Sequence, residues 1–278
     1  MATQTIVITG STQGLGYGYA QEFLRRGHRV VVSGRTQTGV DAAQLRLAAA
    51  GSAEAERVAG AACEVSDLAA VQALWDFAVQ RFGRVDIWLH NAGFARTGAR
   101  FADNTPAEIE AMLRSNVIGS INAAQVAIAG MRRQGGGKLY LTLGGGGASG
   151  RVVPGMTVYS TTKRAVKYLA DCLVKERREA KDESILIGTI SPGVNITEGM
   201  LREMRCLPGE ARARAIKQLN FIGEHVETTT PWIVERILAD TRQGNDITWL
   251  TGGRLAGRAL GMLLGGKRDI TSRYSFEG

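Results

Sequence analysis

The chain has 278 residues, a formal net charge of +8, and ordinary proportions of hydrophobic (44%) and charged (22%) residues. This length supports one large domain with a substantial core. No apolar run approaches the roughly 20 residues needed to cross a bilayer, which excludes a transmembrane helix. The first residues lack the charged region of a signal peptide, so we expect a cytoplasmic protein.

The positive charge and the three cysteines point to no dedicated binding site. A basic surface attracts nucleic acid, anionic lipid or acidic small molecules, but no nucleic-acid-binding motif accompanies it here. We therefore interpret the charge as a contribution to solubility and expect no nucleic-acid partner. Cys63, Cys172 and Cys206 are widely spaced and match no metal-binding pattern, so we expect reduced thiols and no metal.

A strand followed by a glycine-rich turn opens the chain. Residues 5–9 form an apolar, β-branched run typical of a buried strand, and residues 17–26 have a helical pattern. Between them, Gly10, Gly14 and Gly16 permit a tight turn and close backbone approach, and the helix offers its N-terminal amides to a phosphate. A glycine turn in this context predicts a dinucleotide-binding site.

The next predicted strand ends near a cationic side chain. In dinucleotide-binding folds, an acidic residue at this place holds the ribose of NAD, but no Asp or Glu occurs between Glu22 and Asp41. Arg35 stands there instead, and a guanidinium suits the 2′-phosphate of NADP(H). We therefore favour NADP(H); the alternative is that Arg35 is a solvated loop residue.

The rest of the chain alternates between helical and strand patterns with short connections. This alternation predicts an α/β fold, a single Rossmann-type domain over residues 1–278 with a doubly wound parallel sheet of about seven strands and helices on both faces. The predicted strands are residues 5–9, 28–33, 57–63, 85–89, 138–143, 184–190 and 246–250. The predicted helices are residues 17–26, 40–50 and 68–82, one that starts near 105, one that carries 159–163 and runs to about 180, and residues 198–227 and 231–241.

Two polar segments fall near the carboxyl edge of this predicted sheet. Residues 90–93 (His-Asn-Ala-Gly) form a small-residue turn after a strand, at the edge where ligands bind in doubly wound folds. His90 either relays protons or packs within this turn. Asn116 lies inside a predicted helix, where an asparagine costs helix propensity and therefore needs a reason.

A tyrosine and a lysine lie four residues apart on one helix, so Tyr159 and Lys163 share a face of it. An ammonium near a phenol favours the phenolate and lowers the tyrosine pKa, which predicts that Tyr159 exchanges a proton close to neutral pH. Alone this pattern is uninformative, because any surface helix can contain it. Its meaning comes from the motifs around it.

Together these motifs resemble the short-chain dehydrogenase/reductase family over about residues 3–255. The resemblance implies a homodimeric or homotetrameric NADP(H)-dependent oxidoreductase acting on a small-molecule carbonyl. In it Tyr159 donates the proton, Lys163 lowers the pKa of Tyr159 and binds the nicotinamide ribose, and Asn116 links the relay to solvent. The residues expected to bind the cofactor are Gly10, Ser11, Thr12, Gln13, Gly14, Leu15, Gly16, Arg35, Glu64, Val65, Asn91, Ala92, Gly93, Tyr159, Lys163, Pro192, Gly193, Val194 and Thr197.

The chain departs from the family pattern at the catalytic serine. Counting back from Tyr159 places that serine at Gly146, and counting from the end of the strand places it at Gly144. The nearest hydroxyls are those of Thr142 and Ser149, and backbone amides of the glycine run form another possible donor set. We therefore regard Gly144, Gly146 and Ser149 as candidate substrate-binding residues.

The glycine-rich run and the segments around residues 138–200 and 247–270 resemble the chlorophyll(ide) b reductase branch of the family. This resemblance implies that a ring formyl group of a tetrapyrrole is reduced to hydroxymethyl with NADPH. The alternatives are a reductase or dehydrogenase for another ketone, aldehyde or alcohol, and an NADP-binding regulatory protein that has lost its chemistry along with the serine. The presence of Tyr159, Lys163 and Asn116 argues against the last.

Residues of about 194–226 are expected to form a lid over the substrate. The arginines of this segment either meet substrate carboxylates or form a solvated helix face. These arginines are Arg202, Arg205, Arg212 and Arg214.

The tail, about residues 254–278, places apolar residues at helical spacing beside basic ones. It either packs at a subunit interface or touches a membrane surface as a peripheral contact. We favour packing, because Gly257, Gly261 and Gly265 weaken a free amphipathic helix.

Overall fold

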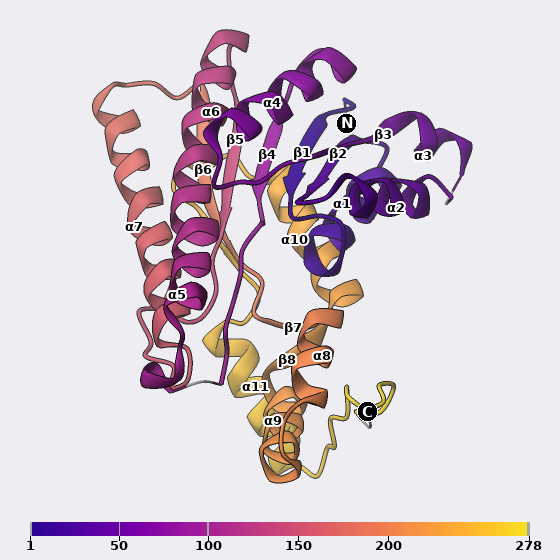
Figure 1. The fold of residues 1–278 in the computed structure, drawn as a ribbon, viewed down its shortest axis with the longest axis vertical. Helices are drawn as coiled ribbons and strands as arrows, with labels where there is room; N and C mark the ends of the chain where they lie inside the picture. Colours follow the sequence, from indigo (N-terminus) through magenta and orange to yellow (C-terminus); the bar gives the residue numbers. More distant parts are fainter. Residues whose placement is uncertain (1, 50, 99, 277–278) are drawn as a thin grey trace.

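The computed structural model describes residues 2–49, 51–98 and 100–276. Its centre is a seven-stranded sheet in the order β3-β2-β1-β4-β5-β6-β9 (Figure 1), and every neighbouring pair is parallel. The predicted α/β class and the number of strands are therefore confirmed. The strands are β1 (Thr5–Thr9), β2 (Arg29–Gly34), β3 (Val58–Ala62), β4 (Ile87–His90), β5 (Gly137–Thr142), β6 (Ile185–Ser191) and β9 (Asp246–Thr248).

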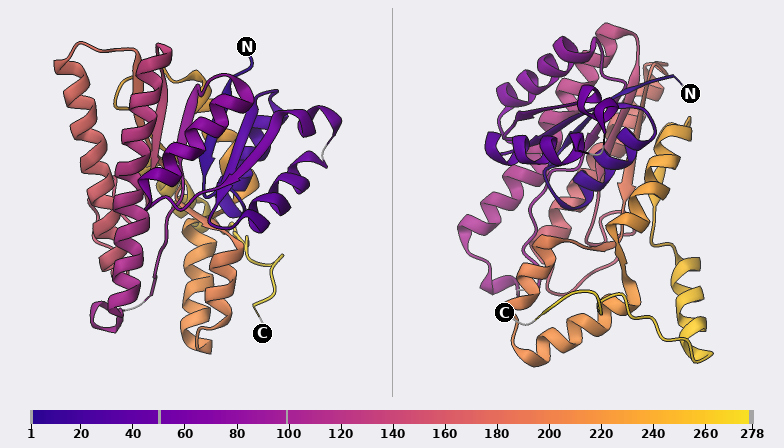
Figure 2. Two further views of the ribbon diagram at one scale, coloured as in Figure 1. Left: turned by 45° about the horizontal axis from the view of Figure 1, so that its top comes forward. Right: turned by 90° about the vertical axis from the view of Figure 1, so that its right-hand side faces the viewer.

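Helices cover both faces of the sheet (Figures 1 and 2). One face packs against α4 (Leu68–Phe82), α6 (Gly119–Gln134) and α7 (Thr157–Glu179) through a core that includes Trp75 and Trp88. The other packs against α1 (Gly14–Arg25), α2 (Gln37–Ala48) and α10 (Val226–Ala239). Successive strand residues enter the two cores alternately, which is why each strand is apolar without interruption.

The order of the sheet places the two motif-bearing turns side by side. The connections from β1 run outward in one direction and those from β4 in the other, so β1 and β4 flank the point where the strand order reverses. Thr9 at the end of β1 pairs with His90 at the end of β4. Ligands of doubly wound sheets bind at this switch point.

The helix that carries Asn116 is not uniform. It consists of α5 (Pro106–Met112), a π turn over Leu113–Ile118, and α6. At its start, near the predicted residue 105, Thr105 and Glu108 form a capping box. A π turn inserts one residue into the helix and commonly marks a functional position.

Several local predictions were wrong. The segment predicted as helical over residues 198–227 contains α8 (Glu198–Arg205) and α9 (Gly209–Ile222), but also a strand. This strand, β8 (Gly223–His225), pairs with β7 (Val194–Ile196). The helix predicted from residue 231 begins at Val226 instead, with Pro231 inside it; Thr229 and Thr230 donate hydroxyl hydrogen bonds to carbonyls of its first turn. A short helix, α3 (Ser52–Arg57), was not predicted.

The tail packs on the predicted lid of the same chain. After α11 (Gly252–Leu263), residues 264–276 run back along α8 and α9 (Figure 2), where Ile270, Tyr274 and Phe276 contact a small apolar cluster. Glu224 accepts hydrogen bonds at 2.9 Å from both Arg258 and Arg268. Both arginines also donate to carbonyls at the end of α9. The last residue of the predicted helix 40–50 and the last two of the tail lie outside the described residues.

The outer side of α11 is apolar, and Leu263 and Leu264 are 83% and 79% exposed. Arg254, at the start of the helix, instead faces inward and lies over the ring of Trp249 at 3.7 Å. Over the described parts of the chain, no helix has the length and apolar character needed to cross a bilayer.

Close packing in the main core depends on Gly130. A Cβ atom at this position in α6 would lie 2.2 Å from the ring of Trp75. We expect Gly130→Ala to lower the free energy of unfolding by about 1–3 kcal/mol through overpacking. The matched control is Gly257→Ala in α11, where nothing lies within 4 Å of the added atom; better helix propensity makes that variant neutral or slightly more stable. Urea denaturation measures the unfolding free energies of both variants. Equal values for Gly130→Ala and Gly257→Ala would contradict the role of Gly130 in core packing.

Candidate active site

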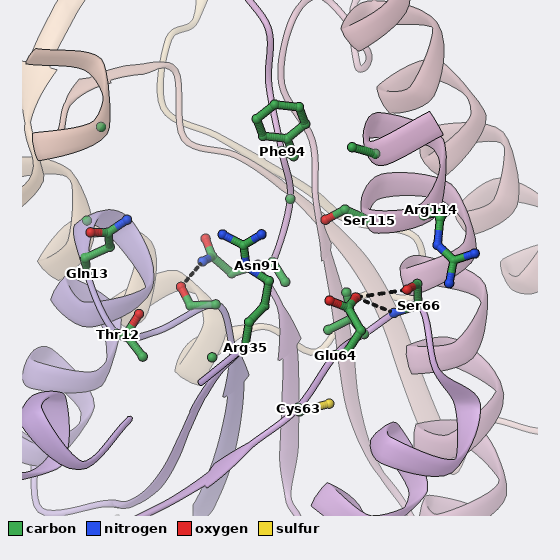
Figure 3. Close-up of a pocket in the computed structure, with 18 of the residues that line it drawn as sticks. Thr12, Gln13, Arg35, Cys63, Glu64, Ser66, Asn91, Phe94, Arg114 and Ser115 are labelled. Carbon is green, nitrogen blue, oxygen red and sulfur yellow. Dashed lines mark hydrogen bonds between the residues drawn. The ribbon is translucent and has the colours of Figure 1, made fainter. Parts of the chain in front are cut away.

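A cavity of about 580 Å³ opens at the carboxyl edge of the sheet, between the β1 and β4 turns and the start of α8. Figure 3 shows Thr12, Gln13 and Asn91 on one side and Arg114 and Ser115 on the other. This volume is in the range of small-molecule and cofactor sites. The predicted cofactor residues that line it are Gly10, Thr12, Gln13, Gly14, Arg35, Glu64, Val65, Asn91, Ala92, Gly93 and Thr197.

The glycine turn is shaped by close backbone approach. Gly10 has φ of +64°, and a Cβ there would lie 2.8 Å from Ala92 Cα. A Cβ at Gly16 would lie 2.3 Å from the carbonyl oxygen of Gly10. Gln13 precedes α1 as N-cap without a side-chain capping bond, so the first amides of α1 are free to bind an anion. These features fit the pyrophosphate of a dinucleotide.

The residue that follows β2, Arg35, brings a cation to the lining of the cavity. Arg35 is exposed and lines the cavity, and Figure 3 draws its side chain between Asn91 and Glu64. Glu64 is occupied locally, because it accepts hydrogen bonds from the backbone N–H and the hydroxyl of Ser66. The charge of Arg35 suits a phosphate, and binding of the 2′-phosphate by this residue stays a prediction.

Other predicted cofactor residues lie outside the cavity lining. Ser11 is fully buried and joins β1 to β2, donating to Ile8 O and accepting from Ser33 N. Leu15 packs against the core. The remaining residues outside the lining are Gly16, Tyr159, Lys163, Pro192, Gly193 and Val194.

The cavity also contains residues that the sequence did not single out. Arg114 and Ser115 come immediately before Asn116, but the π turn changes which helix face they occupy, so helical periodicity could not identify them. Their proximity to Asn116 was the only available indication. The others are Gly34, Cys63, Ser66, Phe94, Ala111, Glu198 and Gly199.

Asn116 connects the cavity wall to the start of α7. It is fully buried, and its side-chain amide donates to Phe94 O at 2.8 Å and to Thr162 Oγ1 at 2.9 Å. Its oxygen accepts from Phe94 N. The Thr162 hydroxyl then donates to the carbonyl of Tyr159 at 2.7 Å. Asn116 thus fixes the first turn of α7, a contact that explains an asparagine inside a helix.

Lys163 is buried beside this network. Its side chain is 4% exposed, and Nζ donates to Thr142 O at 2.9 Å. A Cβ at Gly93 would lie 3.3 Å from Nζ and 3.0 Å from Asn116 Oδ1, so Gly93 touches both groups. Burial lowers the pKa of Lys163 to about 8.

The expected lowering of the tyrosine pKa is wrong for this structure. Lys163 Nζ lies 5.9 Å from the centre of the Tyr159 ring, and burial raises the pKa of Tyr159 to about 12. Desolvation of the phenolate therefore exceeds the attraction of the ammonium. Among the described residues, Tyr159 Oη has no hydrogen-bond partner.

His90 holds the β4 turn in place. The hydroxyl of Thr9 accepts from the N–H groups of Asn91 and Ala92 and contacts His90 Nδ1 at 3.0 Å. With both lone pairs used, the hydroxyl proton points to Nδ1, so the imidazole carries its proton on Nε2. Burial and the charge of Lys163 lower the pKa of His90 to about 3. A neutral His90 fits the packing alternative rather than a proton relay.

The structure distinguishes the two candidate serine positions. A Cβ at Gly144 would lie 2.4 Å from Tyr159 Oη, whereas a Cβ at Gly146 would meet Arg151 O at 2.1 Å. Gly144 is therefore the position that faces the phenol. Ser149 is exposed, and its hydroxyl accepts from Arg151 N.

The segment predicted as a lid begins beside the cavity, which Thr197 lines. Thr197 caps α8 by accepting from Met200 N, and its methyl group is 3.3 Å from the Cβ position of Gly14. Two of the four lid arginines are used by the tail: Arg205 and Arg212 donate to the carbonyls of Ser275 and Phe276. Arg202 and Arg214 are exposed.

The chain is similar to known proteins over most of its length. The family described as short chain dehydrogenase matches residues 4–205. The probable chlorophyll(ide) b reductase NYC1 of Arabidopsis thaliana is 30% identical over 265 residues, which cover 91% of this chain and 51% of that protein. The chlorophyll(ide) b reductase NOL of Oryza sativa subsp. japonica is 29% identical, covering 84% of this chain and 66% of that protein. The chain thus spans about half the length of NYC1.

Solved structures share the fold. Levodione reductase superposes with a TM-score of 0.77 at 23% identity, covering 92% of this chain and 99% of that one. ElxO with NADP bound superposes with a TM-score of 0.75 at 21% identity, covering 92% of this chain and all of the other.

The buried amine of Lys163 makes stability depend on pH. Its pKa of about 8 in the folded chain lies below about 10.4 in an unfolded chain. Between these values the unfolded chain binds more protons, so the folded state gains stability as pH rises. The buried ammonium therefore destabilises the folded state fully below about pH 8, and this destabilisation disappears as pH approaches the pKa of the unfolded chain. Lys163→Met has no ammonium to bury and is therefore more stable than the wild type at low pH. The difference in unfolding free energy between the two proteins should shrink by up to about 3 kcal/mol between about pH 7 and pH 10.5.

Chemical denaturation at both pH values measures this difference. Lys175→Met on the same helix is the control, because the Lys175 side chain is 79% exposed. Parallel changes in all three proteins would show that Lys163 is not the group responsible.

Proposed function

The chain belongs to the short-chain dehydrogenase family, and on that premise we propose that it is an NADPH-dependent oxidoreductase that reduces a carbonyl group. The observation that carries this proposal is the assembly of Asn116, Tyr159 and Lys163 at the edge of a cavity that opens on a free helix N-terminus and a cationic side chain. An interaction protein without chemistry would need no buried amine next to a phenol.

In the proposed reaction, Tyr159 and Lys163 have separate roles. When bound, NADPH supplies the hydride for the new C–H bond. Tyr159 gives its phenolic proton to the carbonyl oxygen, and a proton from solvent then restores the phenol. An aldehyde and one proton, with NADPH, thus yield a primary alcohol and NADP⁺. A high pKa keeps Tyr159 protonated until this transfer, and Lys163, held by Thr142 O, supplies the nearby positive charge that favours the phenolate as it forms.

We propose a tetrapyrrole as substrate, with a ring formyl group of a chlorophyll(ide) b-like molecule reduced to hydroxymethyl. Support comes from the relatives at about 30% identity that are named chlorophyll(ide) b reductases. The glycine run beside Tyr159 also leaves the substrate side of the phenol without side chains. Another aldehyde or ketone is the competing substrate, since structural neighbours include levodione reductase.

Substrate class is tested by NADPH oxidation with chlorophyllide b beside a panel of simple aldehydes and ketones. We expect turnover with the chlorin, and loss of at least about 100-fold in Tyr159→Phe because the proton donor is removed. NADPH binding should stay unchanged in this variant. Turnover of simple carbonyls alone would reject the tetrapyrrole, and tight NADPH binding without any turnover would favour the regulatory alternative.

Cofactor choice is tested at Arg35. We expect Arg35→Ala to weaken NADPH binding about 10- to 100-fold, the loss typical of a charge-assisted contact, while NADH binding changes little. Fluorescence titration with both nucleotides measures the two affinities. Arg84→Ala is the control, because Arg84 precedes β4 and lies at the opposite edge of the sheet. Equal losses of affinity for NADPH and NADH would show that Arg35 does not bind the 2′-phosphate.

A further inference from the structure

The Tyr159 phenol fills the space where a side chain at position 144 would begin. The Cβ position of Gly144 lies 2.4 Å from Tyr159 Oη, and that of Gly145 lies 2.9 Å from the same ring. Non-bonded heavy atoms do not approach so closely in folded proteins. A serine at this place is therefore incompatible with the observed position of Tyr159.

Three neighbouring hydroxyls do not take the place of that serine. On β5, Leu141 and Leu143 enter the core beneath α7, so the alternating side chain of Thr142 points to the other face. The Ser149 hydroxyl accepts from Arg151 N in an exposed turn. The Ser160 hydroxyl is covered by the glycine run and closed to solvent.

The backbone of the glycine run offers donors instead. The amide N–H groups of Gly144, Gly145 and Gly146 donate to no atom of the described residues, whereas Gly147 N donates to Gly144 O at 2.9 Å. Gly145 and Gly146 have φ of +55° and +79°, a conformation that glycine adopts without strain. Successive free amides in such a turn form a concave site for an anion or a partial negative charge.

We propose that the backbone amides of residues 144–146 polarise the substrate carbonyl, in place of a side-chain hydroxyl. This inference rests on the proposed reductase function and names the groups that hold the substrate oxygen while Tyr159 protonates it. The amides donate hydrogen bonds only and exchange no proton. Their effect grows as negative charge develops on the oxygen, which is the requirement for catalysis by an oxyanion site.

The first test introduces side chains at position 144. Gly144→Ser restores the hydroxyl of the family, and Gly144→Ala adds the same Cβ without it. We expect both to lower kcat by about 100-fold or more, because the added Cβ displaces either the Tyr159 phenol or the backbone that carries the amides, with NADPH affinity unchanged. Gly257→Ala is the matched glycine control, because its added atom meets nothing. A Gly144→Ser enzyme as active as the wild type, beside an inactive Gly144→Ala, would overturn the proposal.

The second test needs no turnover and no variant. The protein labelled with ¹⁵N-glycine and loaded with NADP⁺ is titrated with formate, a small carboxylate that presents oxygens to the site. We expect downfield shifts of the amide protons of residues 144–146 and none at Gly257. Unchanged resonances would overturn the proposal. If the shifts occur but no carbonyl is reduced, the reductase function fails while the oxyanion site stands, so the two failures are distinguishable.

Discussion

The hydrogen bond from Lys163 to the carbonyl of Thr142 connects the helix that carries Tyr159 to the end of the central sheet. It holds a cation in a place where burial opposes charge. Asn116 completes the arrangement by tying Phe94 to the first turn of α7 through Thr162. Two buried polar contacts, one to β5 and one to the π turn, therefore hold the first turns of α7 that carry the phenol.

Much of this architecture could be predicted because it is encoded locally. Uninterrupted apolar strands, a glycine turn between a strand and a helix, and a capping box at Thr105 each follow from neighbouring residues. Such patterns gave the correct α/β class and sheet. They also identified most of the residues that line the cavity, since these follow directly after strands β1, β2, β3 and β4.

The rest depends on contacts between distant segments. The π turn at Leu113–Ile118 shifts the helix face that carries Asn116, and the pattern of apolar residues in the sequence does not indicate a π turn. The strands β7 and β8 are short and form a pair only when the fold brings their two segments together, so neither segment predicts a strand by itself. The tyrosine pKa was wrong in direction because spacing along a helix fixes neither burial nor the 5.9 Å separation from Lys163. Likewise, counting residues could not distinguish Gly144 from Gly146, whereas the collision with Tyr159 does.

The ion pairs of Arg258 and Arg268 with Glu224 join the tail to the segment predicted as a lid. Their donors also occupy the carbonyls at the end of α9, so the lid cannot swing away from the tail without exposing a carboxylate and several backbone oxygens. Opening is thereby a joint movement of two segments far apart in the sequence. Any movement of this segment then depends on contacts remote from the cavity, so changes in the tail over residues 258–276 would alter access to the site.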